Sequence, residues 1–210
     1  MIDERQQIAS VRRTLGDRTI EADAARVSTI SQVYDTGIED LWDVVTSAER
    51  ISRWFMPVTG ELKEGGHYQI TGNANGTVTR CEPPRGYAAT WEYGGQVSWI
   101  EVRLTPESAT RTRFELEHVA QVDDELWDRF GPGATGIGWD MTLWALVHHL
   151  EKPDAVPDPA EVAAWIASDG GKLFMRLSSD RWAEVAVANG DDPEVARARA
   201  DRSYDTYTGA

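Results

Sequence analysis

His118 is the side chain in this sequence that is best placed to do chemistry. In the strand-like segment TRFELEHVA, residues 112–120, Phe114, Leu116 and His118 alternate with charged residues and so share one strand face. An imidazole on an apolar face could orient a bound ligand through its polar tip. The alternative is a core histidine whose hydrogen bonds are satisfied inside the protein, and the sequence leaves both interpretations open.

Other chemistry-bearing patterns have an ordinary explanation here. Residues 131–136, GPGATG, fit the GxGxxG spacing, but the helical-looking ELWDRF precedes them where a dinucleotide site needs a parallel strand. We therefore expect a structural turn. The sequence has no HExxH, cysteine pair, Walker loop or GxSxG elbow. We predict no cofactor and no metal site, and we assign no catalytic residue.

Aromatic residues are the second signal, because the chain contains nine tryptophans. Trp91 and Trp139 could fill a core or line a pocket, and Trp99 could equally lie outward or at an edge. The strand YAATWEY places Tyr93 on the same face as Trp91. The candidate ligand-binding residues are Trp91, Tyr93, Phe114, Leu116, His118, Trp139 and Leu143.

The elements that must position these residues form an α+β pattern. A strand beginning at Arg26 precedes two short helices that end at Pro57. Turn signals then separate strand-like pieces from Gly60 to about Val122, which indicates an antiparallel meander. A long helix follows, reaching Lys152. Its apolar residues Trp139, Leu143, Leu146, Val147 and Leu150 should face the concave sheet.

The two ends of the chain extend this unit. Ile8, Val11 and Leu15 have helical spacing, so we expect a peripheral amphipathic helix that ends near Gly16 within residues 1–25. After a Pro- and Asp-rich connector, residues 153–210 read as helices. The side of the long helix that carries Met141 and Trp144 is too apolar to face water. We expect the helices of 153–210 to cover that side of the 26–152 domain.

Composition limits the function classes. The chain has 210 residues and a net charge of −14, which disfavours nucleic acid and anionic lipid as partners. No apolar stretch approaches the length of a membrane span or a signal peptide. Cys81 is the single cysteine. These features lead us to expect a cytoplasmic protein, and they leave its oligomeric state open.

The order of elements resembles a known family. Together with AERISRWFMP, GTVTRCEPPRGYAATWEY and GIGWDMTLWALVHHL, it resembles activator of heat-shock-protein ATPase homologues, within the SRPBCC or START-like superfamily. The resemblance covers roughly residues 26–152. It implies a helix-grip fold, in which a curved sheet wraps a long C-terminal helix around an internal hydrophobic cavity.

Three functions remain open. The first is binding of a small hydrophobic or amphipathic molecule in that cavity, with His118 as its polar anchor. The second is a cyclase- or hydrolase-like enzyme, which would need a second titratable group beside His118. The third, implied by the resemblance, is a protein that interacts with a chaperone ATPase through a surface patch.

Overall fold

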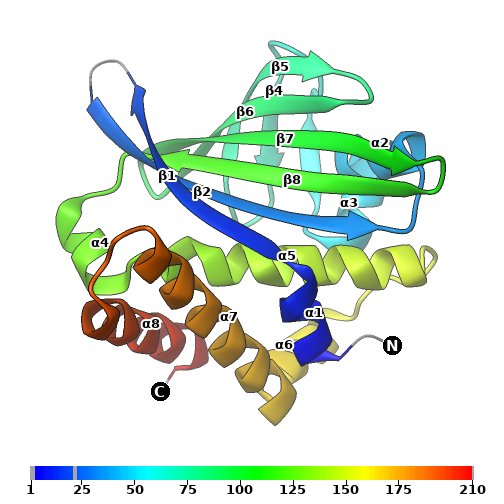
Figure 1. Cartoon of the computed structure of the whole chain (residues 1–210). Helices are drawn as coiled ribbons and strands as arrows, with labels where there is room; N and C mark the ends of the chain where they lie inside the picture. The colour runs from blue at the N-terminus through cyan, green and yellow to red at the C-terminus, as the bar shows by residue number, and fades with distance from the viewer. Residues whose placement is uncertain (1–2, 21–22, 210) are drawn as a thin grey trace.

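One antiparallel sheet of eight strands dominates the computed structural model, which describes residues 3–20 and 23–209 (Figure 1). The strand order is β1-β2-β8-β7-β6-β5-β4-β3, and every pair is antiparallel. The strands are β1 (Arg12–Ile20), β2 (Asp23–Tyr34), β3 (Val58–Gly60), β4 (His67–Ile70), β5 (Asn75–Glu82), β6 (Gly86–Tyr93), β7 (Gln96–Ser108) and β8 (Arg111–Ala120). The predicted meander is confirmed, with the three-residue β3 added at its edge.

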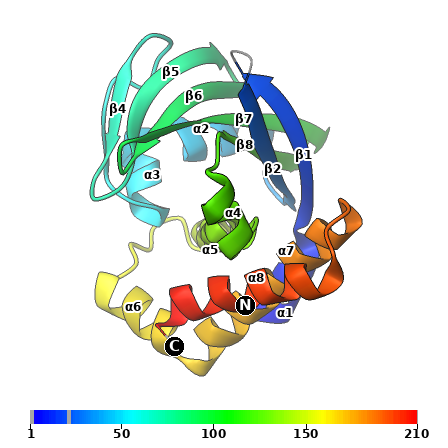
Figure 2. The same cartoon turned by 90° about the vertical axis from the view of Figure 1, so that its left-hand side faces the viewer.

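Eight helices complete the described part of the chain. They are α1 (Glu4–Ser10), α2 (Ile38–Thr46), α3 (Ala48–Trp54), α4 (Asp124–Phe130), α5 (Gly133–Glu151), α6 (Pro159–Ala167), α7 (Asp169–Ala188) and α8 (Pro193–Thr208). Figure 2 shows the sheet curving over α5, with α6, α7 and α8 on the other side of that helix. This is the predicted α+β helix-grip fold with a helical C-terminal extension. None of these helices is long and apolar enough to cross a membrane.

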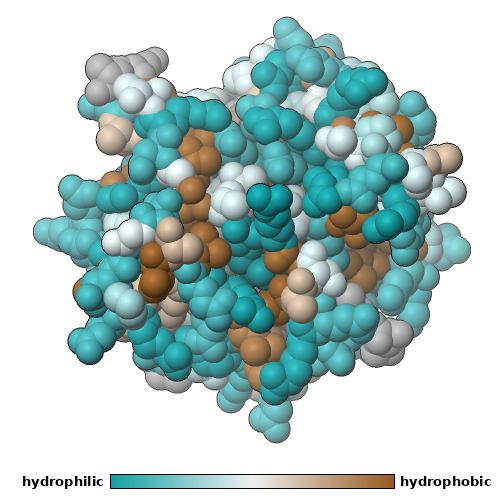
Figure 3. Space-filling model, viewed as in Figure 1, coloured by the Kyte–Doolittle hydropathy of each residue, from teal (hydrophilic) through white to brown (hydrophobic). Residues whose placement is uncertain are grey.

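Period-two alternation produces the main core. In β8, Phe114 and Leu116 are buried in the core that also holds Leu143 and Leu146 of α5. Their neighbours across the ladders, Leu104 and Val102 of β7 and Ile30 of β2, are buried with them. Paired residues of an antiparallel ladder point to the same face, so these positions form one apolar surface. The opposite face carries charged residues together with a small apolar cluster that includes Val27, Val119 and Trp99. Figure 3 shows a largely hydrophilic exterior.

The outer face of the sheet carries alternating charges in a connected row. Arg80 Nη2 lies 2.6 Å from Glu101 Oε1, which also accepts a hydrogen bond from Arg103 Nε at 3.0 Å. The Nη1 atom of Arg103 in turn lies 3.0 Å from Glu115 Oε1. Of these residues, Arg103 and Glu115 lie directly opposite each other on the neighbouring strands β7 and β8, and such a pair helps fix their register.

The N-terminal segment differs from the prediction. The helix ends at Ser10, not near Gly16, and Arg12–Ile20 is the strand β1, paired with β2 from Arg12↔Ser31 to Ile20↔Asp23. The spacing of Ile8, Val11 and Leu15 fits one face of a helix. Val11 and Leu15 are also four residues apart, an even separation that fits one face of a strand equally well, so the spacing alone could not distinguish the two structures. Pairing with β1 satisfies the backbone N–H and C=O groups along one edge of β2. A longer helix in place of β1 would have left those groups without a partner in the sheet. The segment is therefore an integral part of the sheet.

The glycine-rich run 131–136 is a turn followed by the start of a helix. Gly131, at φ 57°, caps α4, and α5 already begins at Gly133, earlier than predicted. A Cβ atom at Gly136 would lie 2.4 Å from the Trp182 indole, so this glycine permits α7 to pack closely on α5. The segment before the run is α4, which excludes the strand–loop–helix arrangement of a dinucleotide site.

The C-terminal extension packs on the side of α5 that carries Met141 and Trp144. Trp144 of α5 stacks on Phe174 of α7, with ring centroids 4.4 Å apart, and meets Trp165 of α6 edge-on at 4.2 Å. Met141 and Ile8 of α1 pack in the same cluster. Both ends of the chain therefore contribute to the coverage of α5.

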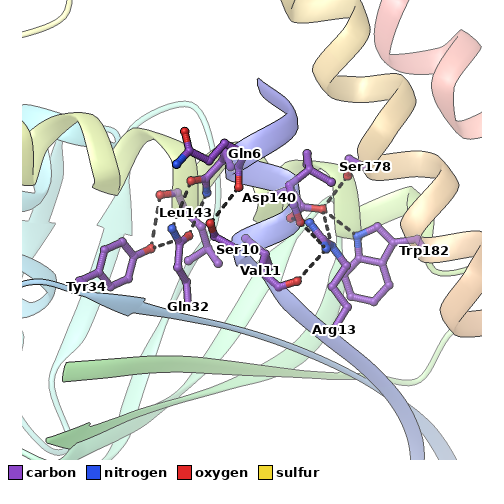
Figure 4. Close-up of polar contacts among 12 residues, drawn as sticks. Gln6, Ser10, Val11, Arg13, Gln32, Tyr34, Asp140, Leu143, Ser178 and Trp182 are labelled. Carbon is purple, nitrogen blue, oxygen red and sulfur yellow. Dashed lines mark hydrogen bonds and ion pairs between the residues drawn. The ribbon is translucent and has the colours of Figure 1, made fainter. Parts of the chain in front are cut away.

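A buried ion pair lies between these layers (Figure 4). The Asp140 carboxylate is fully buried and accepts hydrogen bonds from Arg13 of β1, with Nε 3.0 Å from Oδ2 and Nη2 2.5 Å from Oδ1. Its Oδ2 also accepts from Ser178 Oγ at 2.6 Å and from Trp182 Nε1 at 3.0 Å. We call these four residues the Asp140 cluster; they join β1, α5 and α7.

Candidate functional site

The candidate site lies inside the grip, near the end of the sheet where the chain passes through α4 into α5. His118 stands two residues before the end of β8, and Trp139 lies in the second turn of α5. The Trp139 ring contacts two others at their edges, Trp91 at a centroid distance of 5.3 Å and His118 at 5.6 Å. Together with Ser98 of β7, these residues form what we call the Trp139 site.

Hydrogen bonds connect three members of the site. His118 Nε2 lies 2.9 Å from Ser98 Oγ, and Ser98 Oγ donates to the backbone carbonyl of Trp91 at 3.1 Å. Ser98 faces inward because it continues the alternation of Ile100 and Val102, and it pairs across the ladder with Trp91. The indole Nε1 of Trp139 is buried and has no hydrogen-bond partner in the described part of the chain. Buried donors without an acceptor are rare in folded proteins.

The site is electrically neutral. Burial lowers the pKa of His118 to about 4, so its imidazole is uncharged at neutral pH. Within residues 3–20 and 23–209, Asp140 is the only buried carboxylate, and it is bonded to Arg13 in the Asp140 cluster. Burial is the single cause of the lowered His118 pKa, and no charged group of the described residues contributes to it. The second titratable group that the enzyme hypothesis requires is therefore not evident from the electrostatics of His118.

Most of the predicted site residues meet in the interior. Phe114, Leu116, His118, Trp139 and Leu143 are buried, and Trp91 is half-buried against them. Tyr93 is the exception. It is 61% exposed, because it ends β6 at the hairpin formed by Gly94 and Gly95 and lies beyond the reach of α5. Tyr93 shares a face with Trp91 but does not line the interior.

Sequence reasoning did not identify the polar residues that complete the interior. Ser98 had a detectable signal, because QVSWIEVRL places it in step with Ile100 and Val102. Gln32 and Tyr34 of β2 also face inward, where Tyr34 Oη lies 3.3 Å from both Gln32 Oε1 and the Leu143 carbonyl (Figure 4). Their alternation with outward residues could have marked them, but their hydrogen-bond partners could not be read from local sequence.

The neutral state of His118 predicts a pH-dependent stability. Unfolded histidine binds a proton near pH 6.5, whereas folded His118 does so only at about pH 4. As pH falls through this window the unfolded state binds more protons, so stability falls, by about 3 kcal/mol in total from this residue. Urea unfolding at about pH 7 and about pH 4.5 should therefore show a smaller loss in His118→Leu than in the parent. Equal losses in the two proteins would contradict this prediction.

Comparison with known proteins shows which family and which solved structures this chain is similar to. The family model for Activator of Hsp90 ATPase homolog 1-like protein matches residues 35–151. The crystal structure of CalU16 from Micromonospora echinospora is 34% identical, with a TM-score of 0.64, and covers 84% of this chain and 96% of CalU16. Its solution NMR structure gives 35% identity and a TM-score of 0.68, covering 86% of this chain and 97% of CalU16.

The likeness to CalU16 extends beyond residues 26–152, because the match covers 86% of this chain and residues 26–152 make up a smaller part of it. A conserved protein of unknown function from Enterococcus faecalis shares the fold, with 14% identity and a TM-score of 0.57 over 85% of this chain and 92% of its own. No curated protein gives a significant match. From the family match and the identity to CalU16, the chain belongs to the Activator of Hsp90 ATPase homolog 1-like family, within the SRPBCC or START-like superfamily.

Proposed function

We propose that this protein binds a small hydrophobic or amphipathic molecule between the sheet and α5, at the Trp139 site. The observation that carries the proposal is a buried indole N–H without an acceptor among the described residues, beside a neutral histidine, in a largely apolar interior. An unsatisfied buried donor costs roughly 1–3 kcal/mol, and a ligand that supplies an acceptor recovers that energy. Apolar walls with a few convergent polar groups are the usual character of small-molecule sites.

The ligand takes its place by displacing the Trp139 ring. In the structure this ring occupies the space between Trp91 and His118. Rotation of one aromatic side chain about its two χ angles is a small rearrangement, and side-chain changes of this kind commonly accompany binding. Trp139 therefore acts as both a wall and a gate of the proposed site.

The helix α4 provides the route to the site. It stands at the end of the grip where β8 passes into α5 (Figure 2), and none of its residues is buried. Polar contacts hold it to α8, with Arg199 Nη2 2.6 Å from Asp128 Oδ1 and Ser203 Oγ 2.8 Å from the Phe130 carbonyl. An element with few buried apolar contacts opens at low free-energy cost. Displacement of α4 exposes this end of the interior.

The test combines two measurements on the intact protein. Native mass spectrometry should detect a co-purified molecule, or the neutral probe N-phenyl-1-naphthylamine should bind and quench tryptophan fluorescence. Leu143→Trp fills the interior and should abolish probe binding, at a cost of about 1–3 kcal/mol from overpacking. Val162→Trp adds the same side chain at an exposed position of α6 and should leave binding unchanged.

A second variant keeps the test decisive if Leu143→Trp fails to fold. Trp91→Leu, at a half-buried position of the Trp139 site, should weaken probe binding while the protein remains folded. A parent protein that carries no molecule and binds no probe would refute the proposal. The interaction with a chaperone ATPase would then be the function to pursue.

A further inference from the structure

The short helix α4 is completed by side chains of α8, which lies against it (Figure 1). An α-helix leaves the carbonyl groups of its last four residues without partners inside the helix. In α4 these carbonyls belong to Trp127, Asp128, Arg129 and Phe130. Gly131 N donates to the Trp127 carbonyl at 2.7 Å. The other three carbonyls all accept hydrogen bonds from side chains of α8.

Arg202 and Ser203 supply two of these caps. Arg202 Nε lies 2.6 Å from the Arg129 carbonyl, and the buried Ser203 Oγ lies 2.8 Å from the Phe130 carbonyl. A helix as short as α4 is unstable in water by itself. Its fold therefore depends on the contacts that α8 provides.

Arg199 is the centre of the contact. Its Nη2 atom lies 2.6 Å from Asp128 Oδ1, and its Nη1 atom lies 2.8 Å from Asp191 Oδ2. Asp191 belongs to the turn between α7 and α8, so the C-terminal extension itself holds the guanidinium in position. Gly131, at φ 57°, ends α4 directly against this side chain, since a Cβ atom there would lie 3.1 Å from Arg199 Cδ.

On the side of the sheet, α4 is held by Arg26 of β2. The Arg26 Nη2 atom lies 3.4 Å from Asp124 Oδ1, and the guanidinium lies over the Trp127 ring, 4.3 Å from its centroid. The Asp124 side chain is 91% exposed, and ion pairs at exposed positions contribute little to stability. The stronger set of contacts is therefore the one with α8.

We propose that Arg199, Arg202 and Ser203 form a latch that holds α4 closed, so that the C-terminal helix regulates entry to the Trp139 site. When the latch breaks, α4 loses its C-terminal caps and opens as a unit. The Asp128 side chain is 73% exposed, so its ion pair with Arg199 weakens as the ionic strength rises. This inference rests on the proposed function for what enters, whereas the opening of α4 is measured without a ligand.

Hydrogen exchange of the α4 amides in the intact protein tests the latch. Asp128→Asn keeps the shape of the side chain and removes the charge that pairs with Arg199, so the α4 amides should exchange about two- to five-fold faster. Loss of a negative charge near the C-terminus favours a helix, so the helix dipole cannot explain faster exchange. Raising NaCl from about 0.01 M to about 1 M should accelerate exchange in the parent more than in Asp128→Asn.

Two arginines of α8 give a matched pair of variants. Arg199→Gln removes the bonds to Asp128 and Asp191 and should accelerate α4 exchange about 10-fold. Arg197→Gln makes the same change at a 62% exposed side chain whose ion pairs lie with α7 and with α8 itself, and it should leave α4 exchange unchanged. Stopped-flow quenching by N-phenyl-1-naphthylamine should show faster probe entry in Arg199→Gln and Asp128→Asn than in Arg197→Gln.

The two readouts separate the latch from the proposed function. Equal α4 exchange in Asp128→Asn, Arg199→Gln and Arg197→Gln would overturn the inference and leave the proposed function standing. Faster exchange without faster probe entry would also overturn it, because α4 would then open without controlling the site. A parent protein that binds no probe would refute the proposed function and the regulatory role with it, while the exchange rates would still decide whether α8 holds α4 closed.

Discussion

Replacing Asp140 by alanine is expected to destabilise the protein by about 3–5 kcal/mol. The substitution leaves the buried Arg13 guanidinium without its carboxylate, and it removes the acceptor used by Ser178 and Trp182. Uncompensated charge and unsatisfied donors in the interior both add to the cost. Urea unfolding followed by circular dichroism measures the loss.

Two further variants show whether the loss of stability comes from the buried ion pair. Glu151→Ala removes an exposed carboxylate from the same helix and should change stability by less than about 0.5 kcal/mol. The double variant Arg13→Met with Asp140→Leu removes both charges and should be more stable than Asp140→Ala alone. If Asp140→Ala and Glu151→Ala were equally stable, the Asp140 cluster would not hold the layers together.

Removal of residues 153–210 is expected to unfold most of the remaining chain. The cut exposes Trp144 and Met141, and each large side chain contributes roughly 1.5–3 kcal/mol when buried. It also takes Ser178 and Trp182 from Asp140. Since a domain has only about 5–15 kcal/mol of net stability, these losses together are sufficient to shift the equilibrium to the unfolded state.

Adding the missing segment back controls for the cut. The 1–152 chain alone should give no cooperative thermal transition, and mixing it with a 153–210 chain should restore one. The same mixture with Asp140→Ala in the longer piece should recover less. A 1–152 chain that melted at the temperature of the full protein would show that the extension contributes nothing to the grip.

The sequence predicted elements whose signal is local. Alternation within β5 to β8 gave the inward face that carries Phe114, Leu116 and His118, and turn residues separated the strands. Two limits of local patterns also appear. The strand Val58–Gly60 is too short to show an alternating pattern. Tyr93 shares a strand face with Trp91, but it is exposed because α5 does not extend over it.

Contacts distant in sequence could not be predicted in this way. Arg13 and Asp140 are 127 residues apart, and nothing near Arg13 marks it as a buried partner. Asp140 is one of two acids on α5, with Glu151, and nothing in the local sequence shows that it is buried while Glu151 is exposed. The assignment of residues 12–20 to a strand likewise depended on pairing with β2, a non-local contact that local spacing does not contain.

The position of the Asp140 cluster has a consequence for the order of events during synthesis. The ribosome releases β1, the sheet and α5 before the residues of α7 that carry Ser178 and Trp182 emerge. Until then, the Trp144 side of α5 faces water or whatever binds nascent chains. Contacts between the two ends of a chain form late and slow folding. A ribosome stalled before residue 178 should therefore hold a protease-sensitive chain, and resistance should appear only after α7 has left the exit tunnel.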